Sequence, residues 1–340
     1  MGLCLALDVM GGDHGPGEIV PAALHALTRH RNLELLLVGR EQLVKPALAG
    51  LAPDLTRRLR LIHAPDVVSM DDAPSAALRN SKNSSMRVAV EQVKSSAAQA
   101  CVSAGNTGAL MAISRYVLKM LPGIDRPAIC TVIPGINGHT HILDLGANVD
   151  SSAEQLFQFA VMGVELTSAA ENIAAPKVGL LNVGTEENKG NDRIKQAASL
   201  LSGSHLNYIG FVEGNDIYSG DADVIVCDGF VGNIALKASE GVAQFFLHQV
   251  RAGFGASLYG RVAALVCHPV IKSIRRKTDP RRYNGASLLG LRSIVIKSHG
   301  SADRVSFAHA IEEALLEVKN NIPERITVRL EALLTGSHAS

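Results

Sequence analysis

Short apolar runs recur along the chain, and most of them are continuous instead of alternating with polar residues. Continuous runs of this kind are typical of strands that are buried on both faces of a sheet. Stretches with a helical apolar period follow many of the runs, which indicates βαβ units. The pattern therefore predicts a doubly wound α/β domain with a mostly parallel sheet, whose strands lie at residues 3–9, 33–38, 59–63, 100–103, 128–133, 140–145, 177–183, 207–212, 223–227 and 293–297.

Glycine and small polar or acidic residues follow most of these predicted strands. The clusters read ALDVMGGDHGP, CVSAGNTGAL, LDLGANVD, LLNVGTEENKGN, GFVEGNDI and VIVCDGFVGN. Ligands of an open parallel sheet bind outside the carboxyl ends of its strands, where glycine lets the backbone approach them closely. We therefore expect the clusters to line one cleft at one edge of the sheet. Each cluster by itself is equally typical of a turn followed by a helix N-cap.

The chain of 340 residues can form one large α/β domain or two modest ones. We expect a single domain over residues 1–335 and a frayed tail over residues 336–340. The formal net charge of +1 gives no indication of nucleic-acid binding, and five scattered cysteines lack the spacing of a zinc site. The N-terminus is interpreted as a first strand and not as a signal peptide, and no apolar run reaches the roughly 18 residues of a membrane span.

The segment SAGNTGAL, residues 103–110, combines a strand end, a glycine-rich turn and a helix rich in Ala and Leu. A helix N-terminus with free backbone N–H groups is an anion site, to which Asn106 and Thr107 can add side-chain donors. The segment is neither a dinucleotide-binding fingerprint nor a Walker motif. It therefore favours phosphate or carboxylate binding without requiring a nucleotide.

Other polar loops offer charged groups and hydrogen-bond donors. Lys189 lies in a very polar loop, where it either balances neighbouring glutamates or faces an anion. Asn233 and Lys237 lie one turn apart near a predicted helix start, and His299 follows Lys297 at another strand end. Each of these residues is also compatible with a structural hydrogen bond or a solvated loop. The chain contains no G-x-S-x-G motif, which favours direct transfer between two bound substrates over a covalent acyl-enzyme.

The stretch 250–285 differs from the rest of the chain and predicts a helical hairpin that Pro269 interrupts. An apolar stripe beside a basic cluster is typical of binding at an anionic membrane surface, and the same bases can instead receive an acidic carrier protein. A hairpin packed in a dimer, with its charges in water, is the alternative. The predicted contact residues are Leu258, Val262, Leu265, Val266, Lys272, Arg275 and Arg276, with Arg79 and Lys82 as further candidate bases.

The motifs also carry a family resemblance. They are DVMGGD, SAGNTGAL, LDLGANVD, NVGTEENKGN, VEGND, CDGFVGN and YNGASLLGL followed by IKSHG. In this order, from residue 3 to about residue 330, they resemble the bacterial phosphate acyltransferase family of phospholipid synthesis, PlsX. Departures are small: Val9 stands where the family usually has Ala, and Ser293 where Gly is common.

The resemblance implies that a long-chain fatty acyl group passes from acyl carrier protein to inorganic phosphate. The product, an acyl phosphate, would serve a membrane glycerol-3-phosphate acyltransferase in phosphatidic acid synthesis. The implied fold is a Rossmann-like three-layer α/β/α domain that forms a homodimer. The implied location is the cytoplasm, peripherally attached to the inner face of the cell membrane, with no cofactor, metal or nucleic acid involved.

The residues and the resemblance together predict a site. The candidate catalytic residues are Asn106, Lys189, Asn233, Lys297 and His299. The candidate phosphate- and substrate-binding residues are Asp8, Gly11, Gly12, Asp13, Ser103, Gly105, Thr107, Gly108, Asp144, Asn148, Gly184, Asp228 and Gly229. Two other functions stay open at this point, a small-acyl transferase that uses acyl-CoA and a non-catalytic membrane scaffold. The missing dinucleotide fingerprint disfavours a nicotinamide dehydrogenase.

Overall fold

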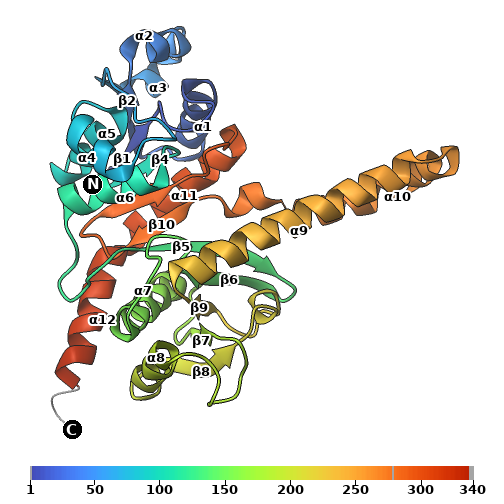
Figure 1. Cartoon of the computed structure of the whole chain (residues 1–340). Helices are drawn as coiled ribbons and strands as arrows, with labels where there is room; N and C mark the ends of the chain where they lie inside the picture. The colour runs from blue at the N-terminus through green and yellow to red at the C-terminus, as the bar shows by residue number, and fades with distance from the viewer. Residues whose placement is uncertain (1, 278, 337–340) are drawn as a thin grey trace.

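The structure is a computed structural model that describes residues 2–277 and 279–336, without the side chains of residues 275–277, 280 and 334–336 (Figure 1). Eleven strands in the described part form one sheet in the order β3-β2-β1-β4-β11-β10-β5-β6-β9-β7-β8. The strands are β1 Leu3–Asp8, β2 Leu33–Gly39, β3 Leu59–His63, β4 Ala100–Ser103, β5 Ala128–Gly135, β6 Gly138–Leu143, β7 Lys177–Leu181, β8 Asn207–Val212, β9 Val224–Val226, β10 Ala286–Leu289 and β11 Ile294–Lys297. All ten predicted strands are confirmed, and β10 was missed.

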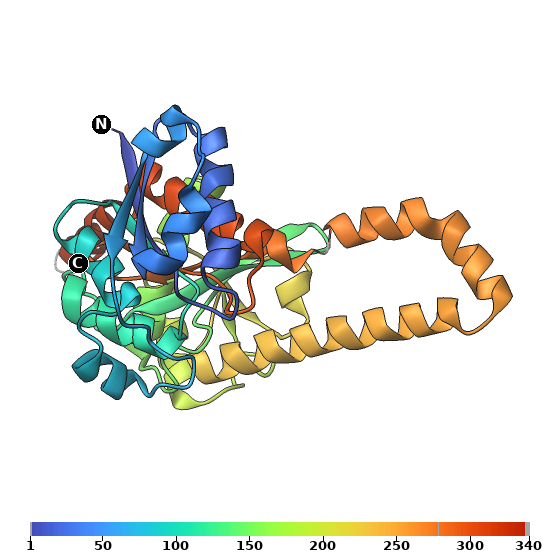
Figure 2. The same ribbon diagram turned by 90° about the horizontal axis from the view of Figure 1, so that it is seen from above.

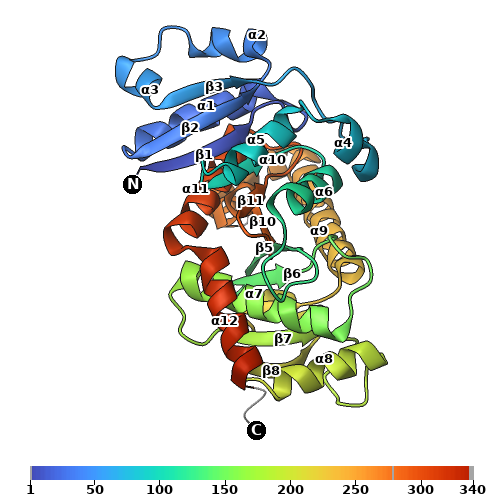
Figure 3. The ribbon, with the colours of Figure 1, turned by 90° about the vertical axis from the view of Figure 1, so that its left-hand side faces the viewer.

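Helices cover both faces of the sheet. They are α1 Pro16–Arg29, α2 Glu41–Val44, α3 Pro53–Arg57, α4 Pro74–Asn80, α5 Ser85–Lys94, α6 Thr107–Leu118, α7 Ala153–Glu171, α8 Asp192–Ser202, α9 Gly229–Gly255, α10 Leu258–Lys277, α11 Arg304–Asn320 and α12 Ile322–Gly336, with 3-10 turns η1 Lys45–Leu48, η2 Asp216–Tyr218 and η3 Pro280–Tyr283. Helices α5, α6 and the start of α9 pack on one face, whereas α1 with α11 and α7 with α8 and α12 form two cores on the other face (Figure 3). The predicted three-layer α/β/α fold is therefore confirmed.

Strand direction changes in the middle of the sheet. β4 and β11 are parallel, but β10 is antiparallel to both β11 and β5, and β5 is antiparallel to β6. β6, β9, β7 and β8 are parallel to one another and run opposite to β1, β4 and β11. The prediction that all the glycine-bearing turns meet at one edge is therefore wrong. The short strand β10, which the sequence pattern did not reveal, is part of the reversal.

The helical hairpin is longer than predicted. Its first arm, α9, begins at Gly229, its second arm, α10, ends at Lys277, and both project away from the sheet (Figures 1 and 2). The prediction that Pro269 interrupts the helix is wrong, because α10 continues through it. Proline removes one backbone hydrogen bond, and in an exposed arm water can bond the carbonyl group that is left free.

The hairpin carries exposed apolar side chains. Leu258 and Val262 are 78% and 54% exposed, and Leu265 and Val266 are also exposed. No single helix in the described ranges is both long and apolar enough to cross a bilayer. The two arms taken together, up to Ile274, meet those criteria but bend by 119°. Lys272 is exposed in α10, which also contains Arg275 and Arg276, but the side chains of these two arginines lie outside the described part. Of the predicted tail, Gly336 ends α12 and residues 337–340 lie outside the described residues.

Candidate active site

Asp8 at the end of β1 is fully enclosed by hydrogen-bond donors. Its carboxylate accepts a bond of 2.7 Å from Ser103 Oγ at the end of the neighbouring strand β4, and others from Ser85 and from the backbone of Met10 and Gly11. Burial raises the pKa of Asp8, and these bonds partly counter the effect. Asp8 therefore joins the β1 and β4 loops and leaves little room for a direct contact with substrate.

The glycines of these loops allow three backbones to approach one another. A Cβ atom on Gly11 would lie 2.7 Å from the nitrogen of Gly105, which belongs to the β4–α6 loop. Gly12 has a φ of 79°, and a Cβ atom there would lie 2.6 Å from the carbonyl oxygen of Gly300, in the β11–α11 loop. Asp13 donates its backbone N–H to that same oxygen at 2.8 Å. The turns after β1, β4 and β11 therefore form one cluster, as predicted for this half of the sheet.

The N-terminus of α6 lies in this cluster. Asn106 is its N-cap, because its Oδ1 accepts the N–H of Ala109 at 2.9 Å. The amide group of Asn106 donates to the carbonyl oxygens of Met70 and Asp72, so both of its hydrogens hold the loop before α4. Because both amide hydrogens are already used, the structure does not support the predicted role of Asn106 as an oxyanion donor. The backbone N–H groups of Thr107 and Gly108 have no acceptor among the described residues, and they remain available to an anion.

Lys297, the last residue of β11, brings a cation to the same cluster. Its side chain is 7% exposed, and Nζ donates to the carbonyl oxygens of Ala104 and Ser298. Burial lowers the pKa of Lys297 to about 8, although the charges of Asp8 and Asp13 act in the opposite direction. A bound anion would favour the charged ammonium form, which makes this group suited to phosphate.

His299 lies at the exposed side of the cluster. Its Nδ1 accepts the backbone N–H of Ser301 at 3.2 Å, so the neutral ring carries its proton on Nε2. Desolvation and the charge of Lys297 lower the pKa of His299, which favours this neutral form. The imidazole therefore presents an Nε2–H donor. Asn284, which sequence reasoning missed, fixes the His299 loop by accepting its backbone N–H at 2.8 Å and by bonding Ser298 Oγ.

The turns of the other half of the sheet form a second cluster. Asp144, after β6, accepts the backbone N–H groups of Ala147 and Asn148 and the amide of Asn148, so both predicted binding residues build their own loop. Asp228 is the N-cap of α9, and Gly229 donates its N–H to the carbonyl oxygen of Asn148 at 2.8 Å. These contacts stabilise the loop and the start of α9, in agreement with the interpretation of such clusters as a turn followed by a helix N-cap.

Helix α9 connects the two clusters. Its N-cap is Asp228, and Asn233 lies beside Gly146 about one turn later. The charges of Lys237 and Glu240, farther along α9, act on the ring of His299. With a rise of 1.5 Å per residue, Lys237 lies about 14 Å along the axis from the N-cap. The second cluster therefore borders the first one through this helix.

Other predicted residues lie apart from the Lys297 cluster. Lys189 and Gly184 belong to one loop after β7, where the Lys189 side chain covers the glycine. Arg79 donates to the carbonyl oxygen of Ser75 within α4, and Lys82 is exposed after that helix. No contact between Lys189 and the loops around Lys297 appears in the described structure.

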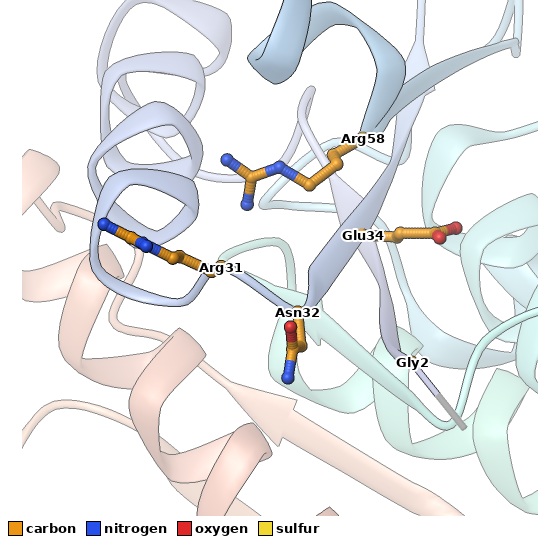
Figure 4. A pocket seen from close by; sticks show the side chains of 5 residues that line it. All are labelled: Gly2, Arg31, Asn32, Glu34 and Arg58. Atoms are coloured by element: carbon orange, nitrogen blue, oxygen red, sulfur yellow. The ribbon is translucent and has the colours of Figure 1, made fainter.

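A separate hollow of about 350 Å³ lies at the opposite end of β1 and β2. It is lined by Gly2, Arg31, Asn32, Glu34 and Arg58 (Figure 4). Arg58 already donates to the carbonyl oxygens of Leu27 and His30 and pairs with Asp54, so its guanidinium group is occupied. The Arg31 and Glu34 side chains point away from each other (Figure 4). This hollow does not resemble a substrate site.

Solved structures with low sequence identity share this fold. A phosphotransacetylase from Streptococcus pyogenes aligns with a TM-score of 0.63 at 17% identity and covers 94% of each chain. A 4-hydroxythreonine-4-phosphate dehydrogenase from Salmonella typhimurium aligns with a TM-score of 0.54 at 13% identity, over 93% of this chain and 99% of that one. These likenesses confirm the α/β architecture.

Relatives of much higher identity cover nearly the whole chain. Residues 3–325 match the family model described as "Fatty acid synthesis protein". Proteins named phosphate acyltransferase from Methylococcus capsulatus and Nitrosococcus oceani are 57% and 56% identical, over 96% and 98% of both chains. A phosphate acyltransferase from Legionella pneumophila is 54% identical over 95% of both chains. The chain therefore belongs to the phosphate acyltransferase (PlsX) family of acyltransferase enzymes.

Proposed function

We propose that this enzyme transfers a long-chain fatty acyl group from acyl carrier protein to inorganic phosphate and releases an acyl phosphate. The observation that carries the proposal is the position of Lys297, whose buried ammonium group contacts the loop that begins α6. Thr107 and Gly108 at that helix N-terminus offer N–H groups for which the described part of the chain supplies no acceptor. A cation beside an open helix N-terminus fits a phosphate dianion.

The chemistry needs little acid or base assistance at its first step. A phosphate oxygen attacks the carbonyl carbon of the thioester, and the carbonyl electrons move onto its oxygen. Collapse of this tetrahedral intermediate breaks the C–S bond and releases the thiolate of the carrier. Phosphate dianion is already a nucleophile, so the enzyme supplies position and charge stabilisation. The Nε2–H group of His299 is the donor that we assign to the developing oxyanion.

The other candidate residues keep supporting roles in this proposal. Gly11, Gly12 and Gly105 let the loops close around the phosphate, and Asp8 with Ser103 holds them together. Asn233 faces the second cluster and Lys189 lies in the β7 loop, so both are assigned to the approach of the acyl donor.

We assign the exposed hairpin to contacts outside the reaction centre. Its apolar residues, with Lys272 on the same arm, fit an anionic lipid surface, which supports the proposal that the enzyme binds peripherally to the inner face of the membrane. There it would deliver acyl phosphate to a membrane glycerol-3-phosphate acyltransferase. Arg79 and Lys82 are candidate contacts for the acidic carrier protein, and the active form is proposed to be a homodimer.

Incubation of the enzyme with a long-chain acyl carrier protein thioester tests the proposal. We expect carrier thiol to be released only when phosphate is present, together with a stoichiometric amount of acyl phosphate. Acyl-CoA substrates of two and sixteen carbons, offered in parallel, report carrier and chain-length preference. Thiol release that does not depend on phosphate would reject the reaction, and a preference for the two-carbon acyl-CoA would indicate a small-acyl transferase.

A further inference from the structure

Two histidines and a glutamate meet on the sheet face that α7 covers, away from the Lys297 cluster. His139 and His141 are two residues apart on β6, so their side chains point to the same face. Glu171 is the last residue of α7. Its Oε1 lies 2.7 Å from Nε2 of His139 and 3.7 Å from Nε2 of His141. One ligand atom from each residue lies within 4.8 Å of the others.

His141 is the unusual member of this group. Its side chain is 2% exposed, because β6 is paired with β5 at Val132 and with β9 at Val224 on either side. Neither of its ring nitrogens has a hydrogen-bond partner among the residues that the structure describes. Buried polar groups are nearly always satisfied, and one that is not calls for an explanation such as an ion. The Nε2 atom faces Glu171, so the ion would lie between them.

The donor set matches a transition metal. Zinc binds imidazole nitrogen and carboxylate oxygen at about 2.0–2.2 Å, so tetrahedral donors are separated by roughly 3.4 Å. The two measured distances to Glu171 Oε1, 2.7 and 3.7 Å, lie on either side of that value. Calcium and magnesium prefer oxygen ligands only, whereas imidazole selects zinc and its neighbours. His139 and Glu171 are partly exposed, so water can complete the coordination.

The alternative to a metal ion is a simple ion pair. Glu171 Oε1 lies at hydrogen-bond distance from His139 Nε2 and at 3.7 Å from His141 Nε2, so an ion pair can include both histidines but gives neither nitrogen of His141 a hydrogen bond in the described structure. A metal ion bonds one of these nitrogens directly.

We propose that His139, His141 and Glu171 bind one divalent transition-metal ion of the zinc class, with water as the remaining ligand. The ion would fasten β6 to the end of α7. In the described structure none of the three residues contacts Lys297, His299 or the α6 N-terminus, so the ion is structural and the proposal does not depend on the acyl transfer reaction.

The test uses the full chain without an affinity tag, freed of metal by a chelator. Titration with Co²⁺, followed by its visible absorption and by competition with Zn²⁺, should give one bound ion per chain. His141→Ala and Glu171→Gln should each weaken Co²⁺ binding by at least about 100-fold, because each removes a direct ligand. Loss of a residue that only bonds a ligand costs less, roughly 10- to 100-fold. His205→Ala, which removes an exposed histidine elsewhere, is the matched control and should bind as the parent does.

Folding of each variant is checked by circular dichroism, and the partly exposed His139→Gln replaces His141→Ala if that variant does not fold. Zn²⁺ should also raise the thermal unfolding midpoint of the parent chain and leave that of Glu171→Gln unchanged. Absence of stoichiometric Co²⁺ binding by the parent chain would overturn the proposal. Equal affinities of the parent and the ligand variants would overturn it too, and would indicate a His–Glu ion pair only.

Discussion

Lys297 Nζ donates a hydrogen bond of 3.3 Å to the carbonyl oxygen of Ala104, so that the end of β11 and the loop that begins α6 share one buried ammonium group. Ala104 lies three residues before Thr107 at the N-terminus of α6, where the N–H groups of Thr107 and Gly108 have no acceptor among the described residues. Each feature alone is common in proteins. Together they offer an anion an ammonium group and two backbone donors from adjoining loops.

Replacement of Lys297 by Met keeps most of the side-chain volume and removes the charge. We expect kcat/KM for phosphate to fall by about 100- to 1,000-fold, the range seen when one preorganised electrostatic donor is removed from a site. Steady-state kinetics at varied phosphate concentrations measure this. The exposed Lys94→Met is the control, and Lys189→Met should have a much smaller effect because its loop does not touch the cluster in the described structure. Comparable losses in all three variants would contradict this assignment.

The second prediction concerns the tautomer of His299. Gln can place an amide N–H near the position of Nε2–H, whereas Leu fills similar space without a donor. We expect His299→Leu to lower kcat by about 100-fold or more, and His299→Gln to recover a clear part of that loss. Single-turnover thiol release measures the chemical step directly. If Gln and Leu are equally impaired, the Nε2–H group is not the oxyanion donor.

Much of this site follows from the sequence, because strands buried on both faces are continuous apolar runs and each is followed by its turn. Those runs located Asp8, Ser103 and Lys297 at the ends of strands correctly. The runs carry no information on strand direction, however. The reversal goes through β10, only four residues long, and it separates the β6 and β9 turns from the β1, β4 and β11 turns.

The sequence also does not show which polar side chains are already used in hydrogen bonds within the protein. Asn106 and Asp144 have the right chemistry for substrate contacts. In the structure, however, Asn106 caps α6 and holds the loop before α4, and Asp144 holds the loop after β6. Asn284 was missed because its role arises only when the segment before β10 reaches the β11 loop. His141 and Glu171 lie thirty residues apart and share no motif, so only their spatial contact reveals them.

The hairpin prediction uses its most exposed apolar side chains. Leu258→Glu with Val262→Glu puts two charges where the proposal puts lipid, and we expect binding to anionic vesicles to weaken at least tenfold. Activity with the soluble carrier substrate should remain. Vesicle flotation measures the binding, and Leu43→Glu with Leu200→Glu, exposed on other helices, is the matched control. Unchanged flotation together with a loss of dimers in sedimentation would instead assign the surface to the dimer.

Glu317 provides a prediction about pH and stability. Burial and the charge of Glu313 raise its pKa to about 8, and it shares a hydrogen bond with Ser287. The folded chain thus holds a proton that the unfolded chain releases above its ordinary pKa of 4.5. The stabilising contribution is full below pH 4.5 and is lost as pH rises through 8. Glutamine cannot titrate, so between pH 5 and pH 9 the free energy of unfolding of Glu317→Gln should fall by a few kcal/mol less than that of the parent chain. The estimate uses about 1.4 kcal/mol per pKa unit. Urea unfolding of both chains at pH 5, 7 and 9 measures it, and equal slopes would contradict the assignment.

The close approach of the glycine loops can be tested with two glycines near each other in sequence. Gly12→Ala adds a methyl group 2.6 Å from the carbonyl oxygen of Gly300, so the two loops must move apart. The φ of 79° at this position also costs an alanine roughly 1–2 kcal/mol of conformational energy. We expect a loss of phosphate affinity larger than the loss of stability. Gly17→Ala meets no atom within 4 Å in helix α1 and should stabilise the chain by about 0.5–1 kcal/mol with activity unchanged. Thermal unfolding and phosphate kinetics of both variants separate the two effects. Full phosphate affinity in a folded Gly12→Ala chain would show that the three loops need not touch to bind the anion.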